Sequence, residues 1–333
     1  MVGVQSEGDA WRTVDWGDMR RILVSGAATW TGGHLIRSLE RGSDTEVIAV
    51  DVLEPRVEFA SELFDFELDR PDFAHFVLDM KPTAVIHLQA VDRSAILGGR
   101  RAHDEAVVGA QALFGAIRRS SSIELVVVKS DICVYGMGPR NPSVVGEDTS
   151  VEGTVGRYGR DLRAVEDFIA ATAARRTDVR FTVLRFAPIF GAEINNPLSR
   201  YLRLPMVPTR IGYDPRMQLI SERDAVEALR HAVTRPVHGV FNVAAPGQQY
   251  LSRVLRLGNR VAQPLPRRAY DIAVKGMGRA NLHLPTHIKR LVHYGLIVDT
   301  DRMTSQLQFE PAMNLRRTIL AGYGQLPART GQS

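Results

Sequence analysis

The feature that most constrains the fold is a glycine-rich turn between a short apolar run and the start of a helical pattern. It lies in residues 22–35, ILVSGAATWTGGHL, where Gly26 and Gly32 hold the first and third positions of a G-x-x-G-x-x-G pattern and Thr29 holds the second. In a strand–turn–helix unit the unpaired N–H groups and the positive dipole end of the helix converge at the turn. The segment therefore predicts a phosphate-binding turn.

An acidic residue follows the turn at an informative spacing. A second apolar run, residues 46–50, ends in Asp51. In dinucleotide sites an acidic residue about 20 residues after the turn accepts hydrogen bonds from the adenosine ribose hydroxyls and repels a 2′-phosphate. The spacing predicts NAD as the ligand and makes NADP the less favoured one. A tight turn without a ligand is the alternative that the sequence leaves open.

Strand and helix patterns alternate over the first half of the chain. Apolar runs predict strands, and stretches of helical period lie between them at 103–118 and 157–176. The predicted strands are residues 21–25, 46–50, 84–88, 125–128 and 181–184. Such alternation implies right-handed crossovers and a parallel sheet. We therefore predict the α/β class, with a Rossmann-type doubly wound parallel sheet.

The pattern changes near residue 190, where prolines become frequent and irregular stretches appear. A helix is expected at 223–233 and a strand at 239–243, which returns to the sheet. The predicted units are a mobile leader (1–19), a NAD(P)-binding Rossmann domain (20–190, with 224–245 returning to it) and a smaller C-terminal substrate-binding lobe (191–223 and 246–325). The lobe should lie over the carboxyl ends of the strands, where open α/β sheets bind their ligands.

Composition excludes several classes of protein. The chain is 44% hydrophobic over 333 residues, enough to bury a full core, and its net charge of +5 arises from scattered arginines without a basic block. We therefore expect no nucleic-acid partner. No apolar run reaches about 18 residues and the first 19 residues do not resemble a signal peptide, so we expect a cytoplasmic protein without a membrane partner. With the single cysteine Cys133 and no histidines at ligand spacing, no metal site is expected.

Several segments beyond the turn together resemble the extended short-chain dehydrogenase/reductases, the NAD-dependent epimerase/dehydratase family. These segments are VIHLQA (85–90), VVKSDICVYG (127–136), LRFAPIFG (184–191), QLISERDAV (218–226) and GVFNV (239–243). The resemblance covers residues 20–325. It implies NAD as cofactor, a nucleotide-sugar or similar small-molecule substrate, and a homodimer formed through the two helices at 103–118 and 157–176.

The resemblance also implies which residues bind the cofactor. They are Gly26, Thr29, Trp30, Thr31, Gly32, Asp51, Glu67, Leu68, Leu88, Gln89, Ala90, Tyr158, Phe186 and Pro188. Gln89 departs from the family, which has a small residue there. Its side chain either reaches the pyrophosphate or nicotinamide amide or narrows the pocket, and the sequence leaves both open.

The catalytic pattern of the family is incomplete in this chain. Family enzymes carry Tyr-x-x-x-Lys on a helix, with a Ser or Thr at the end of the fifth strand, and positions i and i+4 share one helix face. Tyr158 is present, but Leu162 stands at the lysine position and Asp131, with Ser130 beside it, at the hydroxyl position. Without the ammonium, the tyrosine should be a poor base but can still donate a proton. The predicted catalytic residues are Tyr158, Asp131 and Ser130, in an atypical, modified acid–base site.

Two arginines are the candidates for binding a substrate phosphate, because a guanidinium can make bidentate contacts. They are Arg185 and Arg216, but Arg216 lies one residue before the family's arginine position, which is Met217. Three functions therefore stay open: an NAD-dependent epimerase, dehydratase or reductase; a catalytically silent NAD(H)-binding sensor or scaffold; and a non-redox dehydratase, cyclase or isomerase.

Overall fold

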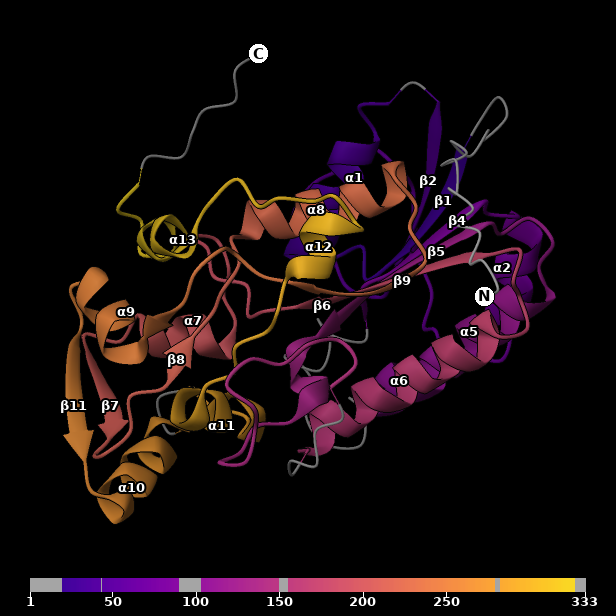
Figure 1. Ribbon diagram of the computed structural model, residues 1–333. Helices are drawn as coiled ribbons and strands as arrows, with labels where there is room; N and C mark the ends of the chain where they lie inside the picture. Colours follow the sequence, from indigo (N-terminus) through magenta and orange to yellow (C-terminus); the bar gives the residue numbers. More distant parts are fainter. Residues whose placement is uncertain (1–19, 43, 90–102, 150–154, 279–281, 327–333) are drawn as a thin grey trace, which may run out of the picture.

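One parallel sheet of seven strands, in the order β3-β2-β1-β4-β5-β6-β9, forms the centre of the molecule (Figure 1). The computed structural model describes residues 20–42, 44–89, 103–149, 155–278 and 282–326. The strands are β1 (Arg20–Ser25), β2 (Thr45–Asp51), β3 (Leu63–Asp65), β4 (Ala84–His87), β5 (Leu125–Asp131), β6 (Arg180–Phe186) and β9 (Gly239–Val243). The strand order runs outward in both directions from β1 and β4, which confirms the predicted doubly wound Rossmann fold.

Helices cover both faces of the sheet (Figure 1). On one face lie α1 (Trp30–Leu39), α8 (Glu222–Thr234) and α12 (Asp301–Ser305), and on the other lie α2 (Phe73–Met80), α5 (Gly109–Arg119) and α6 (Arg157–Ala173). Successive side chains of a strand point to opposite faces, so a strand covered on both sides is apolar throughout. This explains why the sequence shows continuous apolar runs. The predicted homodimer would use α5 and α6, which contact each other, and it stays a prediction.

The remaining elements form a smaller lobe at one end of the sheet, at the left of Figure 1. They are α7 (Pro197–Leu202), β7 (Met206–Arg210), β8 (Arg216–Met217), β10 (Gln249–Tyr250), α9 (Leu251–Leu257), β11 (Val261–Leu265), α10 (Arg267–Met277), α11 (Thr286–Tyr294) and α13 (Leu315–Gly322). β7 pairs with β11, and β8 pairs with β10. α7 and α11 contribute residues to a cavity at the carboxyl ends of β5 and β6. The predicted domain boundaries are not fixed by this arrangement and stay a prediction.

Local differences from the predicted elements have identifiable causes. β5 continues three residues beyond Val128 to Asp131, and a 3-10 turn, η2 (Ile132–Tyr135), follows it. The expected helix at 103–118 begins as a π-helical segment, η1 (Asp104–Val108), before it becomes α5. The helix at 157–176 ends at Ala173, and the Arg176 guanidinium instead donates to the carbonyls of Ile117 and Ser120.

Two kinds of feature are absent from the described residues. Within these residues, no helix combines the length and the apolarity that a bilayer crossing requires. No three His, Cys, Asp or Glu side chains in the same part of the chain come together as metal ligands. The leader at residues 1–19 and the predicted cofactor residue Ala90 lie outside the described residues.

Candidate functional site

The glycine-rich turn links β1 to α1 and needs glycine at both ends for different reasons. Gly26 has a φ of +83°, a conformation that glycine adopts without strain. A Cβ on Gly32 would lie 2.3 Å from the carbonyl oxygen of Gly26, so only glycine lets the helix approach the turn. Neither glycine position therefore carries a side chain that would block the amino end of α1.

Thr29, the departure from the glycine pattern, caps the helix. Its Oγ1 accepts a hydrogen bond from the Gly32 N–H at 3.0 Å and donates to the Gly26 carbonyl at 2.9 Å. Its φ is −72°, so this position does not require glycine. For the N–H groups of Trp30 and Thr31, the first two of the helix, no acceptor lies among the described residues. The turn thus presents two helix N–H donors, as an anion site does.

Asp51 holds the turn against the end of β2. Its carboxylate is buried, and it accepts hydrogen bonds from the N–H groups of Ala28 at 3.0 Å, Val52 at 2.8 Å and Leu53 at 3.1 Å. The acid is therefore built into the wall of the turn rather than exposed to solvent.

The other predicted cofactor residues on this side fall on neighbouring strands. Gln89 follows β4, and its backbone nitrogen would lie 3.1 Å from a Cβ on Gly26; the Cβ of Leu88 would lie at 3.2 Å. The Oε1 of Gln89 is buried and has no hydrogen-bond partner among the described residues. Leu68, which follows Glu67 after β3, is buried against Gly109 of α5.

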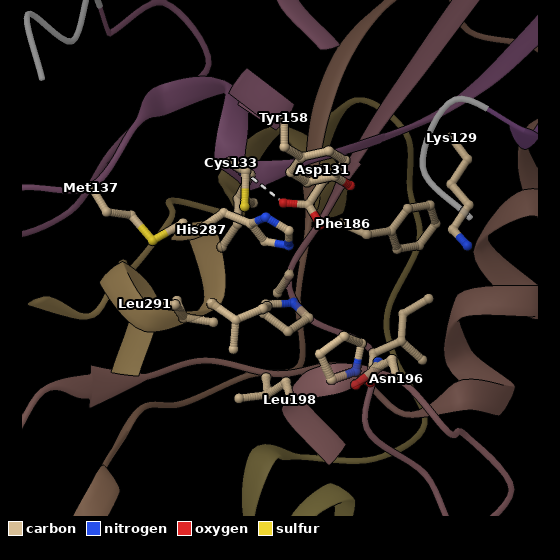
Figure 2. A pocket seen from close by; sticks show the side chains of 16 residues that line it. Lys129, Asp131, Cys133, Met137, Tyr158, Phe186, Asn196, Leu198, His287 and Leu291 are labelled. Carbon is tan, nitrogen blue, oxygen red and sulfur yellow. Dashed lines mark hydrogen bonds between the residues drawn. The ribbon is translucent and has the colours of Figure 1, made fainter. Parts of the chain in front are cut away.

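A cavity lies between the carboxyl ends of β5 and β6 and the helices α7 and α11 (Figure 2). Four of the predicted site residues line it: Asp131, Tyr158, Phe186 and Pro188. The lobe contributes a mostly apolar wall that includes Leu198 and Leu291, together with the amide of Asn196. The cavity thus brings the predicted tyrosine and carboxylate into one space.

Asp131 and Tyr158 line the same cavity, and Tyr158 is close enough to influence the pKa of the Asp131 carboxyl. Asp131 ends β5, and its Oδ1 accepts the Cys133 N–H at 2.7 Å, which caps η2. Burial raises the pKa of the Asp131 carboxyl, whereas the hydrogen bonds from Cys133 and Tyr158 and the charge of Lys129 oppose that rise. The site therefore holds a carboxyl group that keeps its proton more readily than an exposed aspartate does.

Ser130 points to the opposite face of the strand. Its Oγ donates to Oε1 of Glu166, on α6, at 2.6 Å. Alternation along the strand separates it from Asp131. Ser130 does not line the cavity that contains Tyr158, so the structure does not bring the three predicted catalytic residues together.

Neither predicted substrate arginine lines the cavity. Arg185 forms an ion pair with Glu166, Nη2 to Oε2 at 2.5 Å, and its Nη1 donates to the Tyr135 hydroxyl at 2.8 Å. Arg216 donates to the Ser143 carbonyl at 2.9 Å and to Gln248 at 3.1 Å. Both guanidinium groups are thus engaged by partners within the protein.

Sequence reasoning missed the two basic side chains of the cavity, His287 and Lys129. The ring centroid of His287, on α11, lies 4.3 Å from that of Tyr158. No local sequence pattern predicts this contact, because it depends on how α11 docks. Lys129 lies two residues before Asp131 in β5, and strand alternation was a usable signal that both face the same side. Leu162, at the family's lysine position, is 2% exposed and packs in the core.

Two histidines with lowered pKa values make stability depend on pH. Burial lowers the pKa of His87 and of His287 to about 4, below the ordinary value of about 6.5. Such a group takes up a proton more readily in the unfolded chain, so the stability present above pH 6.5 is lost as the pH falls towards 4. We expect the Tm to fall less over this range in His287→Phe than in the wild type. Thermal melts between pH 7.5 and 4.5 measure this, with the exposed His75→Gln as control, and equal falls would contradict it.

Comparisons with known proteins agree with this architecture. The sequence profile described as the NAD dependent epimerase/dehydratase family matches residues 22–244. An uncharacterized protein of Mycobacterium tuberculosis (strain H37Rv) is 32% identical over 301 residues, covering 87% of this chain and 80% of the relative.

Two solved structures are similar in fold. The UDP-glucose 4-epimerase of Thermotoga maritima with UDP-glucose superposes with a TM-score of 0.68 at 18% identity, covering 92% of this chain and 98% of that one. The UDP-glucuronic acid 4-epimerase of Bacillus cereus in complex with NAD gives 0.69 at 16% identity, with the same coverage. By the family match and its sequence relatives, this chain belongs to the NAD-dependent epimerase/dehydratase family.

Proposed function

We propose that the protein binds NAD(H) and is an epimerase, dehydratase or reductase that acts on a nucleotide-sugar or a similar small metabolite. The observation that carries the proposal is the cavity in which the Tyr158 hydroxyl and the Asp131 carboxyl meet at the end of β5. The phosphate-binding turn between β1 and α1 supports it, because the sheet places the turn on the same carboxyl edge.

The residues around the turn fit a dinucleotide. The N–H groups of Trp30 and Thr31 would donate to its diphosphate, which the missing side chains of Gly26 and Gly32 let approach. Asp51 favours the ribose of NAD over the 2′-phosphate of NADP. The buried Oε1 of Gln89 is an acceptor that a cofactor donor would satisfy. A bound NAD would supply a hydride acceptor for a substrate carbon and, once reduced, a hydride donor.

The chain's own residues can move the accompanying proton without a lysine. The Tyr158 hydroxyl and the Asp131 carboxylate line the same cavity, so a substrate hydroxyl can pass its proton to the tyrosine oxygen while the tyrosine proton passes to the carboxylate. One proton leaves the substrate and one arrives on Asp131. A carboxylate whose pKa is raised by burial is a stronger base than an exposed one. The neutral ring of His287 covers Tyr158 on the lobe side.

Support for a nucleotide-sugar in particular comes from family membership. Met217, at the family's arginine position, is fully buried. The two candidate arginines, Arg216 and Arg185, contact other residues of the protein.

A second candidate, a catalytically silent NAD(H)-binding sensor or scaffold, is favoured by one observation. Leu162 is packed in the core, so α6 offers no ammonium beside Tyr158.

Dinucleotide binding and turnover separate these candidates. We expect NADH fluorescence to report binding, with NADPH bound more weakly, and a panel of UDP- and dTDP-sugars to reveal conversion that Tyr158→Phe abolishes without loss of NADH affinity. Binding without any conversion, and a biological readout unchanged in Tyr158→Phe, would identify the sensor instead. A protein that binds neither NADH nor NADPH would refute the proposal.

A further inference from the structure

The wall that α7 and α11 give to the cavity presents mostly carbon atoms (Figure 2). On α11, Leu291 lies four residues after His287 and three after Ile288, so these side chains share one side of the helix. Leu198, near the start of α7, extends the same wall. A substrate can therefore contact this part of the cavity through apolar burial, which does not depend on hydrogen bonds.

The two polar side chains that the described part of the lobe contributes already have contacts within the protein. Asn196 Oδ1 accepts the Ser199 N–H at 2.7 Å, and its Nδ2 donates to the Ile189 carbonyl at 3.0 Å, so this amide serves to cap α7. Burial lowers the pKa of His287 to about 4, which leaves the ring neutral at neutral pH, and the ring lies against Tyr158. Neither group supplies a charge for a substrate.

The charged groups of the cavity lie on β5 and have opposite signs. Among the described residues of the lining, Lys129 is the only lysine or arginine and Asp131 is the only acid. The charge of Lys129 acts on the Asp131 carboxyl, and its Nζ lies 3.4 Å from Oγ1 of Thr31, on the side of α1 rather than of the lobe. A substrate diphosphate would have to leave water beside a carboxyl and an apolar wall, which is costly for an anion. The lining suits an uncharged molecule better.

We propose that the substrate is an uncharged alcohol or ketone without phosphate, whose aliphatic or aromatic body packs against Leu198, Ile288 and Leu291 and whose oxygen lies at Tyr158. The assignment rests on the proposed function and narrows its substrate from nucleotide-sugars to apolar molecules. When such an alcohol is oxidised, its carbinol carbon loses a hydride to NAD⁺, which becomes NADH. The hydroxyl proton passes through Tyr158 to the Asp131 carboxylate, and the product is the ketone.

Binding to the full chain tests this substrate class without turnover. Menthol, cyclohexanol and phenylethanol are titrated in the presence of NADH, and menthone, cyclohexanone and acetophenone in the presence of NAD⁺. Neither combination can exchange a hydride, so the rise in Tm reports binding alone. UDP and UDP-glucose are titrated in the same way. We expect the tightest of the apolar probes to bind at least about tenfold more tightly than either nucleotide.

Variants of the wall locate the bound probe. Leu291→Val removes one methylene group and should weaken menthol binding about threefold, whereas Leu291→Ala and Leu198→Ala should weaken it about tenfold. The matched control is Leu255→Ala, because Leu255 is buried on α9 and does not line the cavity. This control should lose a comparable amount of stability but keep the affinity for menthol.

The outcomes separate the substrate class from the proposed function. Tighter binding of UDP or UDP-glucose, or a failure of every apolar probe to bind, would overturn the substrate class and leave the binding of NAD(H) intact. Apolar probes that bind the Leu291 and Leu198 variants as well as the wild type would overturn their assignment to this cavity. A wild type that binds neither NADH nor NAD⁺ would overturn the proposed function itself.

Discussion

Replacing Arg185 by methionine is expected to lower the free energy of unfolding by about 3–5 kcal/mol, because it leaves the Glu166 carboxylate inside the protein without its cation. The two side chains are each 14% exposed, and Nη2 and Oε2 lie 2.5 Å apart. The Ser130 hydroxyl donates to the same carboxylate at 2.6 Å, but a neutral donor cannot replace the lost charge. The cost is therefore that of an uncompensated buried charge.

Urea unfolding at neutral pH measures this loss. The double variant Arg185→Met/Glu166→Leu should recover much of it, because an apolar pair can replace a buried ion pair at little cost. The matched control is Arg230→Met, whose ion pair with Glu227 has side chains 39% and 46% exposed and should contribute at most about 1 kcal/mol. A loss in Arg185→Met no larger than in this control would show that the pair is not buried in solution.

Asp131→Asn is expected to lower turnover by about 10²–10⁴-fold while raising stability at neutral and alkaline pH. The amide oxygen can still accept the Cys133 N–H, but an amide cannot accept the tyrosine's proton. Burial raises the pKa of the Asp131 carboxyl in the folded protein. The group therefore stabilises the folded state at a pH below the pKa that it has in the unfolded chain. This stabilisation is lost as the pH rises through the higher pKa of the folded protein. The variant's gain in Tm should therefore be largest in alkali and vanish in acid.

Thermal melts of the wild type and Asp131→Asn between pH 4 and pH 8, with turnover of any sugar that the panel identifies, measure both effects. Asp79→Asn, which removes a charge from the exposed face of α2, controls for net charge. A variant that is less stable than the wild type at pH 8, or one that retains full turnover, would contradict the role assigned to this carboxyl.

The parallel sheet was predictable because strands buried on both faces must be apolar throughout. The point at which β5 ends was not predictable from the sequence. The apolar run stops at Val128, yet the strand continues through Lys129, Ser130 and Asp131, because these polar side chains have partners on the two faces. Ser130 reaches Glu166, and Lys129 and Asp131 line the cavity. Partners of this kind come from distant parts of the chain, and strand patterns alone do not reveal them.

The candidate site also has a part that the sequence predicts and a part that it does not. Tyr158 and Asp131 were predicted from motifs whose local spacing survives in the sequence, and the structure places them side by side. The ring contact between His287 and Tyr158 depends on how α11 docks, and the pairing of Arg185 with Glu166 joins β6 to α6. Such contacts between separate elements have no signature in a single sequence.

The polar chain of Ser130, Glu166 and Arg185 helps to position Tyr158 from a distance. It joins α6 to β5 and β6 two turns beyond Tyr158. None of the three side chains lines the cavity, so part of what holds the tyrosine over the strand end lies outside the site itself.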